Sequence, residues 1–99
     1  MTTFFCKITP PRPTFAADMS DAERALMQKH AAYWNSAMGE GRVVVFGPVA
    51  DPSGTYGIGI IEAGEAADAI RFMSNDPVIT ARAGFTYDVY AMPRAVSRG

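Results

Sequence analysis

The predicted elements along the 99 residues follow the order strand, helix, strand, strand, helix, strand, which places the chain in the α+β class. Two segments carry apolar residues at helical spacing, and four segments are β-branched or alternate like strands. This order is that of the ferredoxin-like split βαβ motif, in which helices cover one face of an antiparallel sheet. We therefore predict a ferredoxin-like βαββαβ fold.

Composition excludes several classes of protein. Of the 99 residues, 48% are hydrophobic and 19% are charged, and the formal net charge is −1. We expect a single domain, residues 1–99, with an ordered core of about 4–92 and a tail at 93–99. The near-neutral charge argues against nucleic acid, and no run approaches the ~18 apolar residues of a membrane span. Without a recognisable secretion signal, a cytoplasmic location is expected.

The first predicted strand covers Phe4–Thr9 and is rich in aromatic and β-branched residues. Phe4, Cys6 and Ile8 alternate onto one of its faces. The strand stops at Pro10–Pro13, where three prolines in four residues predict a rigid, extended loop.

The first predicted helix begins after Ser20, which suits the N-cap position. Glu23, three residues later, completes a capping box. Gly39 and Gly41 end the helix. Its apolar stripe comprises Leu26, His30, Tyr33, Trp34 and Ala37.

Two neighbouring strands follow. Val43–Phe46 is β-branched and apolar on both sides, and we expect Gly47-Pro48 to break it. Tyr56–Ile61 alternates large residues with Gly57 and Gly59, so we expect another group to pack closely against its bare face. The two-sided apolar strand also predicts that the open sheet face is covered, which favours a homodimer through that face.

The second half of the motif contains a helix at Glu65–Ser74 and a strand at Phe85–Met92. We predict that Ala66, Ile70 and Met73 form the inner face of the helix. A short helix through about Arg82 starts at Asp76, with Pro77 in its first position.

His30 is the only histidine and the first candidate for catalysis, because imidazole accepts and donates protons near neutral pH. It lies one helical turn from Leu26 and from Trp34, a position also typical of a hydrogen-bonded core histidine. Asp76 is the preferred orienting partner, although an aspartate before proline is also an ordinary helix cap. Asp51 is a second option, with a turn as its structural role.

Other residues are candidates for a substrate pocket. Arg12, held between prolines, would bind an anionic oxygen or else remain a solvated loop residue. Tyr33 and Trp34 would wall an aromatic-sized pocket or serve only as core residues. Cys6 is interpreted as buried and inert. With one cysteine and one histidine, a Cys/His metal cluster is excluded, and we expect neither metal nor cofactor.

The order and spacing of several short motifs resemble the YciI-like (YCII-related) family across about residues 4–92. One motif is Pro10–Phe15, and a second is Met27–Trp34, which contains the histidine. A third is Phe46–Val49, followed by Asp51-Pro52 and Gly54. The last is Asp76-Pro77.

The resemblance implies a dimeric α+β barrel of two ferredoxin-like subunits, with a dyad at His30 and Asp76. Phe46, Gly47 and Pro48 join the substrate-binding candidates through their motif. One relative in the family eliminates hydrogen chloride from a chlorinated hydroxyhydroquinone. The wider superfamily includes muconolactone isomerases and cofactor-free monooxygenases.

Three functions follow from these features. The first is a lyase or isomerase that removes a proton from a small aromatic or lactone substrate. The second is a non-catalytic, dimeric ligand-binding or accessory module. The third, weaker alternative is a cofactor-free monooxygenase, suggested by Trp34 beside His30.

Overall fold

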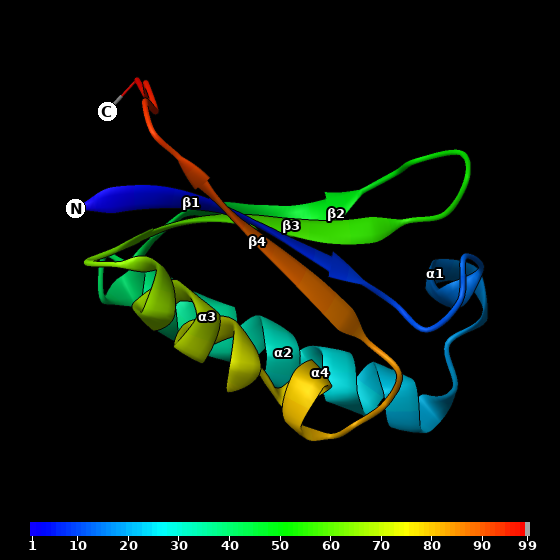
Figure 1. Ribbon diagram of the computed structural model, residues 1–99. Coiled ribbons are helices and arrows are strands. Elements are labelled where there is room, and N and C mark those ends of the chain that lie inside the picture. Colours follow the sequence, from blue (N-terminus) through cyan, green and yellow to red (C-terminus); the bar gives the residue numbers. More distant parts are fainter. Residues whose placement is uncertain (99) are drawn as a thin grey trace.

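The alternating and helical patterns of the sequence build one antiparallel sheet covered on one face by helices (Figure 1). The computed structural model describes residues 1–98. In chain order its elements are β1 (Thr2–Thr9), α1 (Phe15–Asp18), α2 (Asp21–Gly39), β2 (Val43–Val49), β3 (Tyr56–Ala63), α3 (Ala66–Ser74), α4 (Pro77–Thr80) and β4 (Thr86–Met92). The predicted βαββαβ order is confirmed, with α1 as an addition.

The four strands lie in the order β2-β3-β1-β4, and every neighbouring pair is antiparallel. Helices α2, α3 and α4 lie together on one side of this sheet (Figure 1). The core fills the space between the two layers because apolar residues alternate toward the helices on β1. The buried cluster comprises Phe4, Cys6, Ile8, Trp34, Ala37, Val43, Ile61, Ala69, Phe72, Met73 and Val78.

Helix α2 starts with the predicted capping box. The Glu23 N–H donates to the Ser20 hydroxyl at 3.1 Å, and the Ser20 N–H donates to Glu23 Oε1 at 2.9 Å. These bonds satisfy backbone donors that the first helical turn leaves unpaired. At the other end, Gly41 adopts a φ of +81°, a conformation that glycine reaches without strain.

The group that packs against the bare face of β3 is the indole of Trp34. A Cβ atom added to Gly59 would lie 2.2 Å from the Trp34 ring, closer than any side chain tolerates. Gly59 also pairs with Cys6 on one side and with Phe46 on the other, so the indole rests on the middle of the sheet. This glycine fixes how deeply Trp34 sits in the core.

Two sequence predictions about these elements are wrong. Strand β2 does not stop at Gly47-Pro48 but continues to Val49. Because β2 is an edge strand, one of its sides is unpaired, and a residue without an N–H is tolerated there. In α3, Ala69, Phe72 and Met73 face the core, whereas Ile70 is 46% exposed. The helix is therefore rotated relative to the stripe predicted from Ala66, Ile70 and Met73.

The described part of the chain after β4 has no regular secondary structure. Residues 93–98 form neither helix nor strand, and the last residue of the predicted tail, Gly99, lies outside the described residues. Within residues 1–98, no helix combines the length and apolar character needed to cross a bilayer.

Candidate functional site

Asp76 is placed at the centre of the fold by its own local sequence. It is the N-cap of α4, and its Oδ1 accepts the Val78 N–H at 3.0 Å, while Pro77 occupies the first turn. Unlike most helix caps, this side chain is completely buried. A buried carboxylate is costly unless donors satisfy it, so its other contacts matter.

Two side chains of α2 supply those contacts. Nδ1 of His30 lies 2.8 Å from Asp76 Oδ2 and 3.0 Å from Oδ1. The Trp34 indole N–H donates to Oδ2 at 2.7 Å. These two residues stand one helical turn apart and therefore reach the same carboxylate from one helix face. We call His30 and Asp76 the buried pair, and its predicted partners are thus in contact.

The carboxylate of Asp76 also determines which imidazole nitrogen of His30 carries the hydrogen. An ionised carboxylate only accepts hydrogen bonds, so Nδ1 of His30 carries the hydrogen that faces Asp76. In the neutral ring, Nε2 is then the nitrogen with a free lone pair. The His30 side chain is 15% exposed, while that of Asp76 is inaccessible. A ligand therefore meets the imidazole and not the carboxylate.

His30 lines a cavity of about 390 Å³ between the sheet, α1 and α2. Four predicted substrate-binding residues also line it: Trp34, Phe46, Gly47 and Pro48. The walls are overwhelmingly apolar, and Trp34 and Phe46 contribute neighbouring rings whose centroids are 5.7 Å apart. Such a space suits a small ring-shaped ligand with one ionisable group held against His30.

Several lining residues were missed by sequence reasoning. Phe15 and Phe85 come from distant segments, and their rings meet edge to face with centroids 5.1 Å apart. Nothing local in the sequence links these two phenylalanines. Met27 also lines the cavity, and its spacing of three residues from His30 on one helix was a usable signal.

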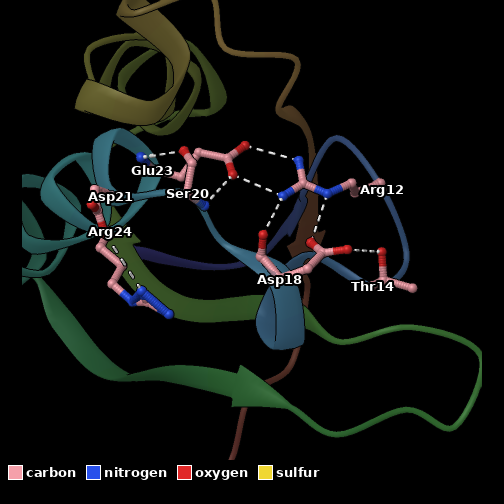
Figure 2. Close-up of polar contacts among 7 residues, drawn as sticks. All are labelled: Arg12, Thr14, Asp18, Ser20, Asp21, Glu23 and Arg24. Atoms are coloured by element: carbon pink, nitrogen blue, oxygen red, sulfur yellow. Dashed lines mark hydrogen bonds and ion pairs between the residues drawn. The ribbon is translucent and has the colours of Figure 1, made fainter.

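Arg12, a predicted substrate-binding residue, lies outside the lining of this cavity and contacts two acidic side chains. Its guanidinium donates to Asp18 Oδ1 at 2.7 Å and to both Glu23 carboxylate oxygens at 2.8 and 2.9 Å (Figure 2). We call Arg12, Asp18 and Glu23 the arginine cluster. The Arg12 guanidinium lies 5.3 Å from the ring centre of Phe15. Phe15 lines the His30 cavity, but Arg12 does not.

The contacts in the arginine cluster shift the titration of each member. Hydrogen bonds from Arg12 lower the pKa of Glu23 from 4.5 to about 2. The Thr14 hydroxyl and then Arg12 lower the pKa of Asp18, and the two carboxylates raise the pKa of Arg12. All three groups therefore stay charged across the physiological range. The cluster joins the loop after β1 to the start of α2.

Tyr33, another predicted substrate-binding residue, does not line the His30 cavity. Its hydroxyl donates to the Phe72 carbonyl at 2.8 Å, and the two rings stack with centroids 4.9 Å apart. Burial raises the pKa of the Tyr33 phenol. Tyr33 instead borders a second cavity of about 340 Å³, together with Arg42 and Arg71.

The two remaining candidates have structural roles. Cys6 is fully buried, and burial raises the pKa of its thiol to about 12, so the reactive thiolate is not formed near neutral pH. Asp51 is exposed and accepts the Ser53 N–H at 2.8 Å within a turn. Within residues 1–98, no group of three or more histidine, cysteine or acidic side chains has the placement of a metal site.

Comparison with known proteins agrees with this architecture. The model of the YCII-related domain matches residues 3–93. A similar solved structure is 5-chloro-2-hydroxyhydroquinone dehydrochlorinase from Burkholderia phenoliruptrix, in complex with 2,5-dihydroxybenzoquinone. It is 20% identical, with a TM-score of 0.54, and the match covers 88% of this chain and 90% of that chain. None of the curated proteins matches. Because the family model spans nearly the whole sequence, the chain belongs to the YCII-related domain family.

Proposed function

We propose that this protein is a small-molecule lyase or isomerase in which His30 removes a proton from a ring-shaped substrate. The observation that carries the proposal is the hydrogen bond between Nδ1 of His30 and the fully buried carboxylate of Asp76. This contact leaves Nε2 available at a cavity of about 390 Å³. The similar dehydrochlorinase, which forms its complex with a substituted benzoquinone, supports the reaction class.

In the proposed reaction, Nε2 of His30 takes a proton from the substrate, and the electron pair of the broken bond moves into the ring. In an elimination, that pair expels a leaving group such as chloride from the substrate. In an isomerisation, the imidazolium returns the proton to another substrate atom. Asp76 holds the ring in its Nδ1–H tautomer and stabilises the imidazolium while it exists.

Trp34 acts in this scheme as a positioning residue. Its indole N–H donates to Oδ2 of Asp76 at 2.7 Å, while the Val78 N–H donates to Oδ1 at 3.0 Å. Together these two donors hold the carboxylate in one orientation under His30. The indole ring also forms part of the cavity wall.

The proposal is tested with His30→Gln and Asp76→Asn on a panel of chlorinated hydroxyhydroquinones and muconolactones. We expect wild-type turnover of at least one compound, measured as chloride release or isomer formation. Both variants should lose most of that activity, at least roughly 100-fold for His30→Gln, because general base catalysis typically contributes 10²–10⁴-fold. Arg12→Gln, outside the cavity, is the control and should retain activity.

Each contrary outcome has a clear meaning. Unchanged turnover by His30→Gln would contradict the role of the histidine. Ligand binding without turnover of any compound would favour the non-catalytic module. Oxygen consumption that accompanies turnover would favour the monooxygenase.

We also propose that a second copy of the chain covers the open face of the sheet. Helices α2 and α3 lie on the opposite side (Figure 1). The open face presents large apolar side chains. Val45 and Tyr90 are 48% and 59% exposed there, beside Phe5 and Ile60. Sheet-to-sheet association would remove this surface from water.

The dimer is tested by measuring molar mass with light scattering. We expect the wild type to have the mass of two chains, and Val45→Lys to have the mass of one. Val96→Lys changes an exposed valine outside the sheet and is the matched control, which should remain a dimer. A single-chain mass for the wild type would contradict the proposal.

A further inference from the structure

The cavity beside His30 has almost entirely apolar walls. Its lining includes the apolar side chains of Ile8, Phe15, Met27, Trp34, Phe46 and Phe85. Among the lining residues in the described part of the chain, none is lysine, arginine, aspartate or glutamate. A carboxylate or phosphate entering this space would lose its hydration without gaining a cation in return.

Arg12 lies in the sequence between two lining residues, Pro10 and Phe15, and its charge is already neutralised. Arg12 makes four hydrogen bonds within the arginine cluster, three to the carboxylates of Asp18 and Glu23 and one to the Asp18 carbonyl (Figure 2). The cluster carries two negative charges against one positive charge. It cannot compensate an additional anion, and Arg12 itself is not a lining residue.

A negative charge lies behind the wall at His30. Asp76 lies directly beneath His30, with its Oδ2 2.8 Å from Nδ1. A substrate that arrives as an anion would be repelled by this carboxylate through a wall of low dielectric. A neutral substrate that becomes anionic only when His30 takes its proton would instead form beside a newly created imidazolium.

We infer that the site selects uncharged phenols and hydroquinones and rejects ring compounds that carry a carboxylate. The inference rests on the proposed function and narrows its substrate class. A cavity of about 390 Å³ is ample for one substituted ring, because an apolar cavity of about 150 Å³ already holds benzene. Among the aromatic and lactone substrates, the inference favours the neutral aromatic ones.

The test compares two ligands that share one ring, hydroquinone and 2,5-dihydroxybenzoate, by calorimetry at about pH 8, where an imidazole is ordinarily neutral. We expect hydroquinone to bind and to shift the NMR signals of the single histidine. The carboxylate should bind at least roughly 10-fold more weakly, because its charge is buried without a partner. Equal or tighter binding of the carboxylate, or failure of hydroquinone to bind, would overturn the inference.

A charge introduced at the cavity supplies the second arm of the test. Thr55 lines the cavity on the loop before β3, so Thr55→Lys places a cation there, and Thr55→Gln is the neutral control. We expect Thr55→Lys to narrow or reverse the preference between the two ligands, and Thr55→Gln to preserve it. The same preference in both variants would overturn the explanation by charge.

These outcomes separate the inference from the catalytic proposal. Selective binding of hydroquinone without turnover of any compound leaves the inference intact and contradicts catalysis. Turnover of a carboxylated ring through His30 supports the dyad and overturns the inference.

Discussion

Two sets of ionisable residues, the buried pair and the arginine cluster, have similar hydrogen-bond distances but opposite surroundings. His30 and Asp76 approach to 2.8 Å in the core, and Arg12 approaches Asp18 and Glu23 to 2.7–2.9 Å at the surface. In the buried pair, one nitrogen of the imidazole stays available beside a cavity. In the cluster, most of the guanidinium N–H groups are already used. The comparison teaches that a catalytic group needs an atom that is still free to bind substrate, and that charge alone is not enough.

The difference also has an energetic side. Removal of Asp76 would leave three donors without a partner, two of them buried, because each relies on the same carboxylate for its hydrogen bond. Loss of one contact in the arginine cluster is compensated by water, since its members are partly exposed. Substitutions in the two regions should therefore differ in size.

The largest effect is expected for Asp76→Ala. It leaves the Trp34 and Val78 donors without a partner, and we predict a loss of ~3–5 kcal/mol in the free energy of unfolding. Urea unfolding followed by the fluorescence of the single tryptophan measures this loss. Asp51→Ala removes a turn aspartate that accepts one backbone hydrogen bond at the surface and should cost much less. Equal losses in the two variants would contradict the expectation that burial of the carboxylate sets the size of the loss.

The next effect comes from Gly59→Ala, which tests the support beneath the buried pair. The new Cβ would lie 2.2 Å from the Trp34 ring, and forcing the indole away should cost ~1–3 kcal/mol. Displacing Trp34 should also weaken its bond to Asp76 and lower activity. Gly57→Ala is the matched control, since its Cβ would have no neighbour closer than 3.8 Å. If both substitutions were neutral, Trp34 would not be held as described.

A smaller effect is expected for Ser20→Ala at the start of α2. The variant removes the hydroxyl that accepts the Glu23 N–H, and N-cap losses typically cost ~1 kcal/mol. Activity per folded molecule should not change, because Ser20 does not line the cavity. Thermal unfolding and turnover, measured on the same sample, check both parts; a selective loss of turnover would contradict this separation.

The smallest effect concerns acid stability. The folded-state pKa of Glu23 is lowered from 4.5 to about 2, so its contribution is present above about pH 4.5 and disappears as the pH falls toward 2. Glu23→Gln keeps a capping-box side chain but not the charge. Its stability should fall less steeply than that of the wild type across this window. Identical slopes in acid titrations followed by circular dichroism would contradict the assignment.

The fold was predictable because its signals are local. The capping box at Ser20, the alternation of Phe4–Thr9 and the bare face at Gly59 each depend on a few neighbouring residues. The errors arose where tertiary position decided the outcome. Pro48 is tolerated because β2 lies at an edge, and Ile70 is exposed because packing rotates α3.

The site was predictable only in part, for the same reason. The candidates His30 and Asp76 stood out as residue types, but their contact joins positions 46 residues apart. The meeting of Phe15 with Phe85 had no sequence signal. The contacts of Arg12 with Asp18 and Glu23 had no sequence signal, because Glu23 was interpreted only as part of a capping box.

The most direct test of the central claim is the tautomer of His30, measured from the nitrogen-15 shifts of the imidazole at alkaline pH. The sequence contains one histidine, so the assignment is unambiguous. The account predicts a hydrogen on Nδ1, bound to Asp76, and a bare Nε2 available to substrate. Asp76→Asn should weaken this preference. A wild-type ring with its hydrogen on Nε2 would contradict the proposed base and the mechanism built on it.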